Sequence, residues 1–192
     1  ILIPSGFTNA RYQSPDKWDA FEKEYPAVAR HLKQYEQKAK SRYDKGEYWW
    51  ELRGCDYYDE FEKPKIMLPD ISLIGNFTLD EEGGKYLANT AYIIGSDEKY
   101  LLGILASSLV DFFYRNISAS YRGGYLRFIY QYLAQIPIAN ATTQDKQEIE
   151  KLVADVLDNK SKASNIEAIN RKVYELYGLT EEEIGIVEGS GN

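Results

Sequence analysis

The spacing of apolar residues predicts helices in the first quarter of the chain. Ser14 and Pro15 mark a helix start, because serine is a favoured N-cap and proline loses nothing at the first helical position. From Pro26 to about Arg42, apolar side chains recur at steps of three and four residues, as expected if one stripe of a helix packs inward. Residues 1–45 are therefore predicted to form an N-terminal helical segment.

The same spacing returns in residues 141–192. Capping signals at Thr142 and Ser164 each precede an amphipathic run, which predicts two helices that pair as a hairpin. A third capping signal at Thr180 predicts a final short helical turn. We interpret this part as a spacer or a docking surface, because its acidic balance would repel phosphate.

Between these helical segments, residues 46–140 contain short β-prone runs. Three of the runs are predicted to be strands: 65–72, 76–79 and 92–94. A turn at Glu82 to Gly84 separates the second run from the third. A helix over 97–116, capped by Ser96, is apolar on several faces and is predicted to cover the sheet. The predicted fold class is α+β: a small, mostly antiparallel sheet covered by helices, with an N-terminal helix and a C-terminal helical hairpin.

Composition limits the class of protein. The 192 residues are 44% hydrophobic, which is enough for one core or for one domain with a helical appendage. No apolar run approaches the roughly 18 residues of a membrane span, so we expect no contact with a membrane. A single cysteine cannot form an internal disulfide, so we expect a cytoplasmic protein. Cys55 and His31 are single residues of their kind, which leaves a zinc site without its usual ligands. Because the chain begins at Ile1 rather than Met, we expect an excised fragment.

The net charge of -7 argues at first against nucleic acid, whose phosphates bind cations. The charges are unevenly distributed, however. Residues 1–45 carry 9 Lys and Arg against 6 Asp and Glu, residues 46–140 carry 8 against 13, and residues 141–192 carry 6 against 11. Between Asp111 and Asp145 there is no acidic residue at all, and three arginines fall in that gap. A local basic surface is therefore predicted within an acidic chain.

No catalytic motif is present. The chain lacks a glycine-rich phosphate loop, a nucleophile elbow and a paired-histidine metal motif. The nearest approach to a metal-dependent nuclease is Pro69-Asp70 followed by Glu82 and Lys85, where two residues separate the acid from the lysine instead of one. A hairpin turn explains the two glycines there better. We therefore predict no catalytic residue and no metal ligand in this chain.

Aromatic and basic residues interleave in one segment, which indicates binding rather than catalysis. Between Phe112 and Tyr132, eight aromatic residues alternate with three arginines, and Gly123-Gly124 would allow close approach of the backbone to a ligand. Arginine can grip the O6 and N7 atoms of guanine. The alternative is that the aromatics form a core and the arginines lie at its rim. Trp49 and Trp50 pose the same alternatives, and we expect at least one of them in the core.

Ten short motifs occur in a recognisable order along nearly the whole chain. They are Pro26 to Arg42, Tyr48-Trp-Trp-Glu-Leu-Arg, Lys63-Pro-Lys-Ile, Pro69-Asp-Ile-Ser, Phe77-Thr-Leu-Asp, Ala91-Tyr-Ile-Ile, Leu102-Gly-Ile-Leu-Ala-Ser, Gly124-Tyr-Leu-Arg-Phe, Tyr132-Leu-Ala-Gln-Ile-Pro-Ile and Val173-Tyr-Glu-Leu-Tyr-Gly. In this order the chain resembles the TaqI-like C-terminal specificity domain of type IIG restriction-modification enzymes and related adenine-specific DNA methyltransferases.

The resemblance implies a division of labour within a longer polypeptide. An N-terminal methyltransferase domain would bind S-adenosylmethionine and methylate a flipped adenine, while this chain selects the target in double-stranded DNA. The chain lacks the Asn-Pro-Pro-Tyr motif of that catalysis, so we expect it to bind no cofactor and to catalyse nothing itself. Residues 46–140 would then be the target recognition core.

Charge and predicted flexibility, rather than the resemblance, suggest which residues contact DNA. We predict that phosphates are held by the basic helix, with Lys33 and Lys40, and by Lys63 or Lys65, although a solvated surface is the plainer interpretation of that helix. We predict that base edges are reached from the turn that begins at Tyr121. The predicted base-contacting residues are Tyr121, Arg122, Tyr125 and Arg127, and Arg53 and Arg115 complete the DNA-binding set.

Two other functions are considered. One is a protein–protein interaction module, in which acidic faces and the Trp49-Trp50 region form an adhesive patch. Its binding would respond little to salt, whereas DNA binding would weaken steeply as salt rises. The other is a stand-alone nuclease, which would require magnesium-dependent cleavage that is sensitive to Asp70.

Overall fold

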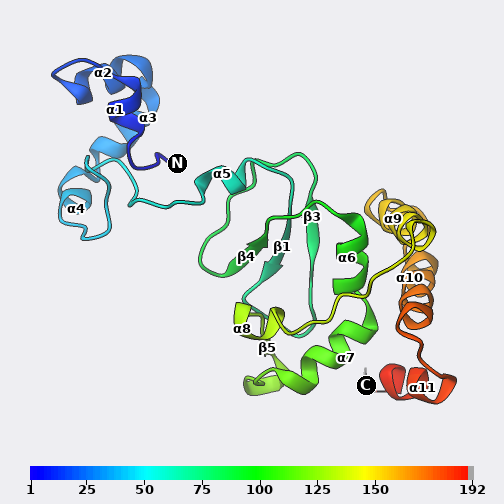
Figure 1. The fold of residues 1–192 in the computed structure, drawn as a ribbon. Helices are drawn as coiled ribbons and strands as arrows, with labels where there is room; N and C mark the ends of the chain where they lie inside the picture. Colours follow the sequence, from blue (N-terminus) through cyan, green and yellow to red (C-terminus); the bar gives the residue numbers. More distant parts are fainter. Residues whose placement is uncertain (190–192) are drawn as a thin grey trace. The chain divides into compact units, whose positions relative to one another are not determined.

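The computed structural model describes residues 1–189 and divides the chain into two compact units. Unit 1 comprises residues 1–59, and unit 2 begins at Glu60 (Figure 1). The aromatic segment after residue 45 packs within unit 1, and the C-terminal helices pack within unit 2. Packing thus divides the chain between residues 59 and 60. The functional division predicted from the sequence, into 1–45, 46–140 and 141–192, stays a prediction.

Unit 1 is a set of short helices around an aromatic cluster. The helices are α1 Phe7–Arg11, α2 Lys17–Glu24, α3 Pro26–Lys33 and α4 Glu36–Lys40, and the short α5 Tyr58–Phe61 crosses into unit 2. Trp18 packs against Trp49 and Trp50, with ring centroids 4.7 and 4.9 Å away. Burial of such large rings dominates the energetics of a small core.

Two helix limits in unit 1 differ from the prediction. The N-cap of α2 is Asp16 rather than Ser14, and its carboxylate accepts a hydrogen bond from the Asp19 amide at 2.9 Å. The single helix expected over 26–42 is two helices, because the chain leaves helical geometry at Tyr35, where φ is -108° and ψ is 5°. Pro26 does occupy the first turn of α3, where a missing N–H costs nothing.

Unit 2 contains two small antiparallel sheets, so the α+β prediction is confirmed. The strands are β1 Lys65–Pro69, β2 Ile71–Ser72, β3 Thr78–Asp80, β4 Ala91–Ile94 and β5 Leu126–Arg127. The first sheet has the order β3-β1-β4, and the second pairs β2 with β5. The prediction of a hairpin turn at Glu82 to Gly84 was wrong, because β3 and β4 lie on opposite sides of β1. The connection must cross the sheet, which local turn residues cannot indicate.

A pair of helices covers this sheet instead of the single helix predicted over 97–116. They are α6 Lys99–Leu105 and α7 Ser108–Ile117. The break occurs because Ser107 caps α7, accepting from the Val110 amide at 3.3 Å while donating to the Ile104 carbonyl at 2.7 Å. Ile66 of β1 and Ile104 of α6 are both fully buried in the same apolar core.

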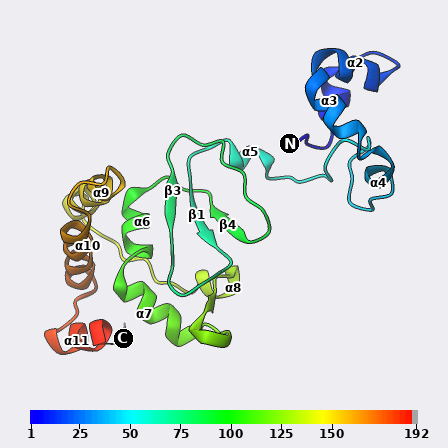
Figure 2. The ribbon, with the colours of Figure 1, turned by 180° about the vertical axis from the view of Figure 1, so that it is seen from behind.

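The C-terminal helices α9 Thr143–Leu157 and α10 Lys162–Tyr177 form the predicted hairpin, followed by α11 Glu181–Gly189. α6 lies between the sheet and this hairpin (Figures 1 and 2). Gly103 of α6 permits the close packing of α6 against α9, since a Cβ at this position would lie 2.6 Å from the Ile149 side chain. The caps at Thr142 and Thr180 are confirmed, with reciprocal hydrogen bonds at Thr180 and Glu183. The cap predicted at Ser164 was wrong, because α10 begins at Lys162.

Candidate nucleic-acid interface

A tight turn projects from the two-stranded sheet of unit 2. The Tyr121 amide donates to the Tyr125 carbonyl at 2.7 Å, which closes a three-residue loop, and Ser120 pairs with Leu126 behind it. Leu126 also pairs with Ser72 of β2, so the base of the turn is held within a sheet. Leu126 is buried, whereas Tyr121 and Tyr125 are 50% and 42% exposed. The turn therefore presents both tyrosines from a fixed base.

Two glycines make this turn possible. Gly123 and Gly124 have φ values of 77° and 78°, a region that other residues adopt only at a cost. A Cβ on Gly124 would meet nothing within 4 Å, and one on Gly123 would meet only the Tyr125 ring at ordinary contact distance. The requirement for glycine here is thus conformational rather than steric.

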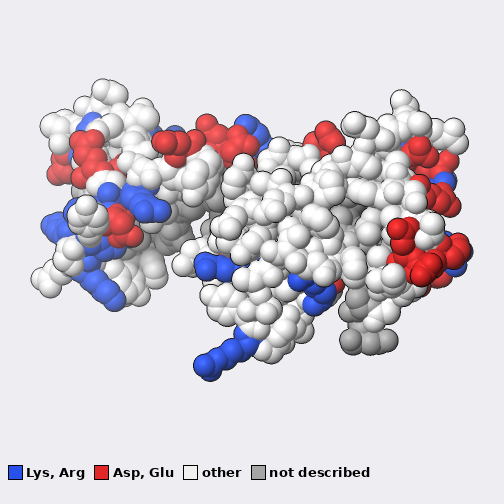
Figure 3. All heavy atoms as spheres, turned by 60° about the horizontal axis from the view of Figure 1, so that its bottom comes forward, with Lys and Arg blue, Asp and Glu red and all other residues white. Residues whose placement is uncertain are grey.

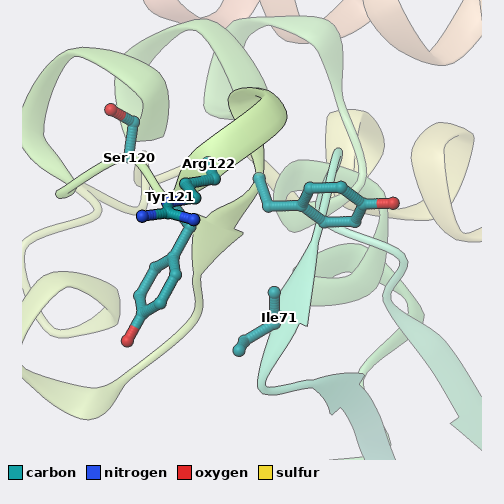
Figure 4. A pocket seen from close by; sticks show the side chains of 5 residues that line it. Ile71, Ser120, Tyr121 and Arg122 are labelled. Carbon is teal, nitrogen blue, oxygen red and sulfur yellow. The ribbon is translucent and has the colours of Figure 1, made fainter.

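An open cavity of about 600 Å³ lies beside the turn, and five residues line it. They are Ile71, Ser120, Tyr121, Arg122 and Tyr125 (Figure 4). Ile71 comes from β2, and the other four come from the turn and the residue before it. Arg122 is exposed, and within residues 1–189 no carboxylate lies within ion-pair distance of it. The cavity thus combines apolar walls with one available guanidinium.

Arg127 lies on the same face of the second sheet, but its charge is paired. In the register of β2 and β5 it is directly opposite Ile71, so the two side chains are neighbours. Its Nε donates to Oδ1 of Asp70 at 3.2 Å. The hydrogen bond that Arg127 donates to Asp70 is the main cause that raises the pKa of Arg127, with smaller effects from Tyr121 and Tyr92. These tyrosines therefore lie near Arg127.

Arg115 reaches the same region from α7. Its Nε donates to Asp111 at 2.7 Å, and its Nη2 donates to the Leu73 carbonyl at 2.6 Å, just after β2. It thus ties α7 to the segment that carries Ile71. Two of the three arginines in the acid-free stretch are accordingly paired with carboxylates from outside it. Asp111 and Arg115 have the i,i+4 spacing of neighbours on a helix, whereas nothing local links Asp70 to Arg127.

The charges of unit 2 are separated on its surface. Seen from the side that carries β5 and α7, this unit shows isolated Lys and Arg side chains, whereas Asp and Glu gather over the C-terminal helices (Figure 3). The segment from Arg115 to Arg127 supplies three cations and no acidic residue. A phosphate backbone would therefore meet less repulsion at the face that carries the turn than at the helical hairpin.

The prediction that Lys65 contacts DNA was wrong. Its side chain is fully buried, and its ammonium donates to Asp80 at 2.5 Å and to the Phe61 carbonyl at 2.6 Å. Together with Lys85, it lowers the pKa of Asp80 well below the ordinary value. Lys63 is exposed and pairs with Glu60 at 2.5 Å. Lys65 begins β1, roughly 17 Å of strand away from Asp70, and Lys63 precedes the strand. Neither lysine therefore lies beside the turn at Tyr121 to Tyr125.

The predicted residues of unit 1 form a separate group. Lys33 and Lys40 are both exposed and share one carboxylate, that of Glu36, at 2.9 and 2.7 Å. Arg53 is exposed, and no acidic side chain within residues 1–189 lies within ion-pair distance of it. These cations are accessible, and their contact with DNA stays a prediction.

The adhesive patch proposed at Trp49 and Trp50 is not present on the surface. Each side chain is only 8% exposed, and Trp50 donates from its ring nitrogen to the buried Thr8 hydroxyl at 3.0 Å. Both tryptophans therefore belong to the core, more than the sequence led us to expect. This removes the tryptophan part of the predicted patch, and a protein–protein module with acidic faces stays an alternative prediction.

The acidic residues of unit 2 do not assemble a metal centre. Asp70 pairs with Arg127, and Asp80 pairs with Lys65 and Lys85. Within the described part of the chain, no three His, Cys, Asp or Glu side chains are grouped as metal ligands. Over the same residues, no helix is both long and apolar enough to cross a bilayer.

Sequence reasoning missed three residues of this face. The sequence places Asp70 only in an imperfect nuclease motif and Ile71 only in a strand, and it predicts no role for Ser120. The strand pattern assigned Ile71 to a pleated segment without showing which face was open. Asp70 and Arg127 are 57 positions apart, so no local signal links them.

Comparisons with known proteins identify the family of the chain. The family described as TaqI-like C-terminal specificity domain matches residues 20–138. The chain is 31% identical over 169 residues to the type II methyltransferase M.XhoI of Xanthomonas vasicola, which covers 85% of this chain and 30% of that protein. It is 32% identical over 133 residues to the type II methyltransferase M.PaeR7I of Pseudomonas aeruginosa, covering 67% and 22%. The chain thus spans less than a third of these relatives.

Proposed function

Since this chain belongs to the TaqI-like C-terminal specificity domain family, we propose that it recognises a target sequence in double-stranded DNA through the turn at Tyr121 to Tyr125. The observation that carries the proposal is the cavity beside this turn, with its apolar wall and unpaired Arg122. DNA binding requires cations for phosphates and shaped polar and apolar contacts for base edges. The turn offers both on a rigid base.

The proposed interface uses each side chain according to its chemistry. The Arg122 guanidinium can bind a phosphate oxygen, and the exposed tyrosines can donate to phosphate or lie against sugar. Ile71 offers an apolar contact of the kind that suits a thymine methyl group. Arg115 contributes by holding the segment after β2, because its guanidinium is already bonded on two sides.

We further propose that catalysis takes place outside this chain. The relatives are named as methyltransferases and are more than three times as long as the matched part. A methyltransferase domain of the same polypeptide would then bind S-adenosylmethionine and modify adenine, while this chain positions the target. The accessible cations Lys33, Lys40 and Arg53 would contact phosphates beyond the recognised bases.

Salt dependence tests the proposal. Affinity of the chain for duplex DNA should fall as salt rises, with a log–log slope of about -0.9 for each phosphate neutralised. Arg122→Ala should weaken binding to all sequences and reduce the slope by about 0.9. Both quantities follow from fluorescence anisotropy with a labelled duplex across a salt series.

Arg171→Ala is the matched control. Arg171 is an exposed arginine on α10 that pairs with Glu167 at 3.2 Å, and it lies in the acidic hairpin. Its loss should leave affinity and slope unchanged. Equal effects of the two substitutions, or binding that ignores salt, would overturn the proposal.

A further inference from the structure

Arg127 is a candidate base contact whose backbone is tied to the core of unit 2. Its backbone belongs to β5, and its carbonyl accepts from the buried Tyr114 hydroxyl at 2.8 Å. Tyr114 in turn stacks on Phe128, with ring centroids 4.6 Å apart. The Arg127 strand therefore rests directly on the core of unit 2.

Asp70 is equally fixed. Its amide donates to the Thr90 carbonyl at 2.8 Å, and its carbonyl accepts from the Phe128 amide at 2.7 Å. Its carboxylate is 16% exposed, whereas the Arg127 side chain is 43% exposed. The carboxylate thus lies behind the guanidinium and leaves the outer part of Arg127 in solvent.

The contact between them uses one particular atom of arginine. Asp70 accepts from Nε, and within residues 1–189 no acceptor engages either Nη atom. The outer edge of the guanidinium therefore keeps two parallel N–H groups available. Such an edge matches the O6 and N7 acceptors of a guanine in the major groove.

The pairing also changes what the positive charge can do. An arginine neutralised by a carboxylate contributes little to the displacement of counterions from phosphate, but its N–H groups remain directional donors. Arg122 has the opposite character, since it is unpaired and stands on a glycine turn. The two arginines of one face are therefore suited to different tasks.

We infer that Asp70 is a positioning residue that fixes Arg127 to read one guanine, while Arg122 supplies affinity for phosphate. This inference rests on the proposed function and deepens it. Asp70 acts through Arg127 and makes no base contact itself. Removing its charge should make Arg127 a better phosphate ligand and a worse reader of bases.

The test is selection of bound duplexes from a randomised pool by the chain and four variants, followed by affinity measurements on the selected sequence. The wild type should select a motif that contains an invariant G·C pair. Arg127→Lys keeps the charge but loses the fork, so discrimination at that one position should fall by roughly 5- to 150-fold. Asp70→Asn should relax the same position while steepening the salt slope by up to about 0.9.

The controls separate positioning from general damage. Arg122→Ala should keep the whole motif at lower affinity, and Arg171→Ala should change nothing. Thermal unfolding of each variant checks the fold, and Asp70→Asn removes the charge while keeping the size of the side chain. A merely structural role of Asp70 would lower the affinity for all sequences alike and would not relax one position of the motif.

The outcomes distinguish this inference from the proposed function. Absence of salt-dependent duplex binding by the wild type would overturn both. Salt-dependent binding without a selected guanine, or a motif that Arg127→Lys and Asp70→Asn leave intact, would overturn the inference alone. Relaxation of the same position by Arg122→Ala would also overturn it, because the two arginines would then share one task.

Discussion

Lys65 at the beginning of β1 and Asp70 just after its end each belong to a pair of opposite charges, yet the two pairs differ in every other respect. Lys65 and Asp80 are both 0% exposed, and the lysine ammonium is further surrounded by backbone carbonyls. Arg127 keeps 43% of its side chain exposed against Asp70. The first pair is sealed within the fold, and the second is open to a ligand.

The difference shows that a basic residue can bind DNA only if the folded protein leaves some of its N–H donors without acceptors. Every hydrogen of the Lys65 ammonium has an acceptor inside the protein. The guanidinium of Arg127 donates to Asp70 from Nε alone, which leaves the N–H groups of its outer edge available. We therefore expect the beginning of β1 to determine stability and the region after its end to determine recognition.

The largest expected effect is the loss of stability when the sealed pair is broken. Lys65→Ala leaves the buried Asp80 carboxylate without its main partner and should lower the free energy of unfolding by about 3–5 kcal/mol. Urea titration followed by circular dichroism measures this, because Trp18, Trp49 and Trp50 all lie in unit 1 and would not report on unit 2. Lys85→Ala is the comparison, because its side chain is 59% exposed and its loss should cost much less. Equal losses would show that burial does not distinguish the two lysines.

A smaller effect is expected at the turn of the open region. Gly124→Ala should lower the free energy of unfolding by about 1–2 kcal/mol, because φ is 78° there and no neighbour opposes a Cβ. DNA affinity should fall with it, although no contacting side chain is removed. Gly124→Asn should cost less on both counts, since asparagine tolerates this conformation. If the two substitutions behave alike, backbone strain does not control the turn.

The smallest effect is a pH dependence that belongs to the sealed region. In the folded state the pKa of Asp80 is lowered mainly by its hydrogen bond with Lys65 and, to a smaller extent, by the one with Lys85. A lowered pKa gives stability that is fully present above the unfolded value of about 3.9 and is lost as pH falls through the folded value. The stability difference between wild type and Lys85→Ala should therefore be present at neutral pH and shrink below about pH 4. Urea titrations at several pH values would show a constant gap if the pairing were unimportant.

Local signals were sufficient for several parts of this fold. The caps at Thr142 and Thr180 involve partners three residues away, so the sequence alone indicates them. The amphipathic period of the C-terminal helices likewise identified a hairpin. The helix break at Ser107 was missed, because apolar residues continue on both sides of it and conceal the cap.

The sequence also indicated where the interface lies, but not which of its charged residues are accessible. The acid-free, aromatic stretch with two glycines contains the turn, and three predicted residues, Tyr121, Arg122 and Tyr125, line one cavity. By contrast, Lys65 was assigned to the surface because lysine usually lies there. Its burial depends on Asp80, which β3 brings alongside in the register of the sheet.

The sequence by itself determined the fold class, the family, the helical hairpin and the position of the exposed turn. Periodicity, capping and glycine conformations act over a few residues, and they leave a pattern in the order of the chain. Only the tertiary structure decided that Arg127 and Lys65 are neutralised by carboxylates distant in the sequence. Asp70 reaches Arg127, and Asp80 reaches Lys65, through strand pairing between distant segments. Burial and strand register are properties of the folded chain, and they alone separate a structural charge from one available to DNA.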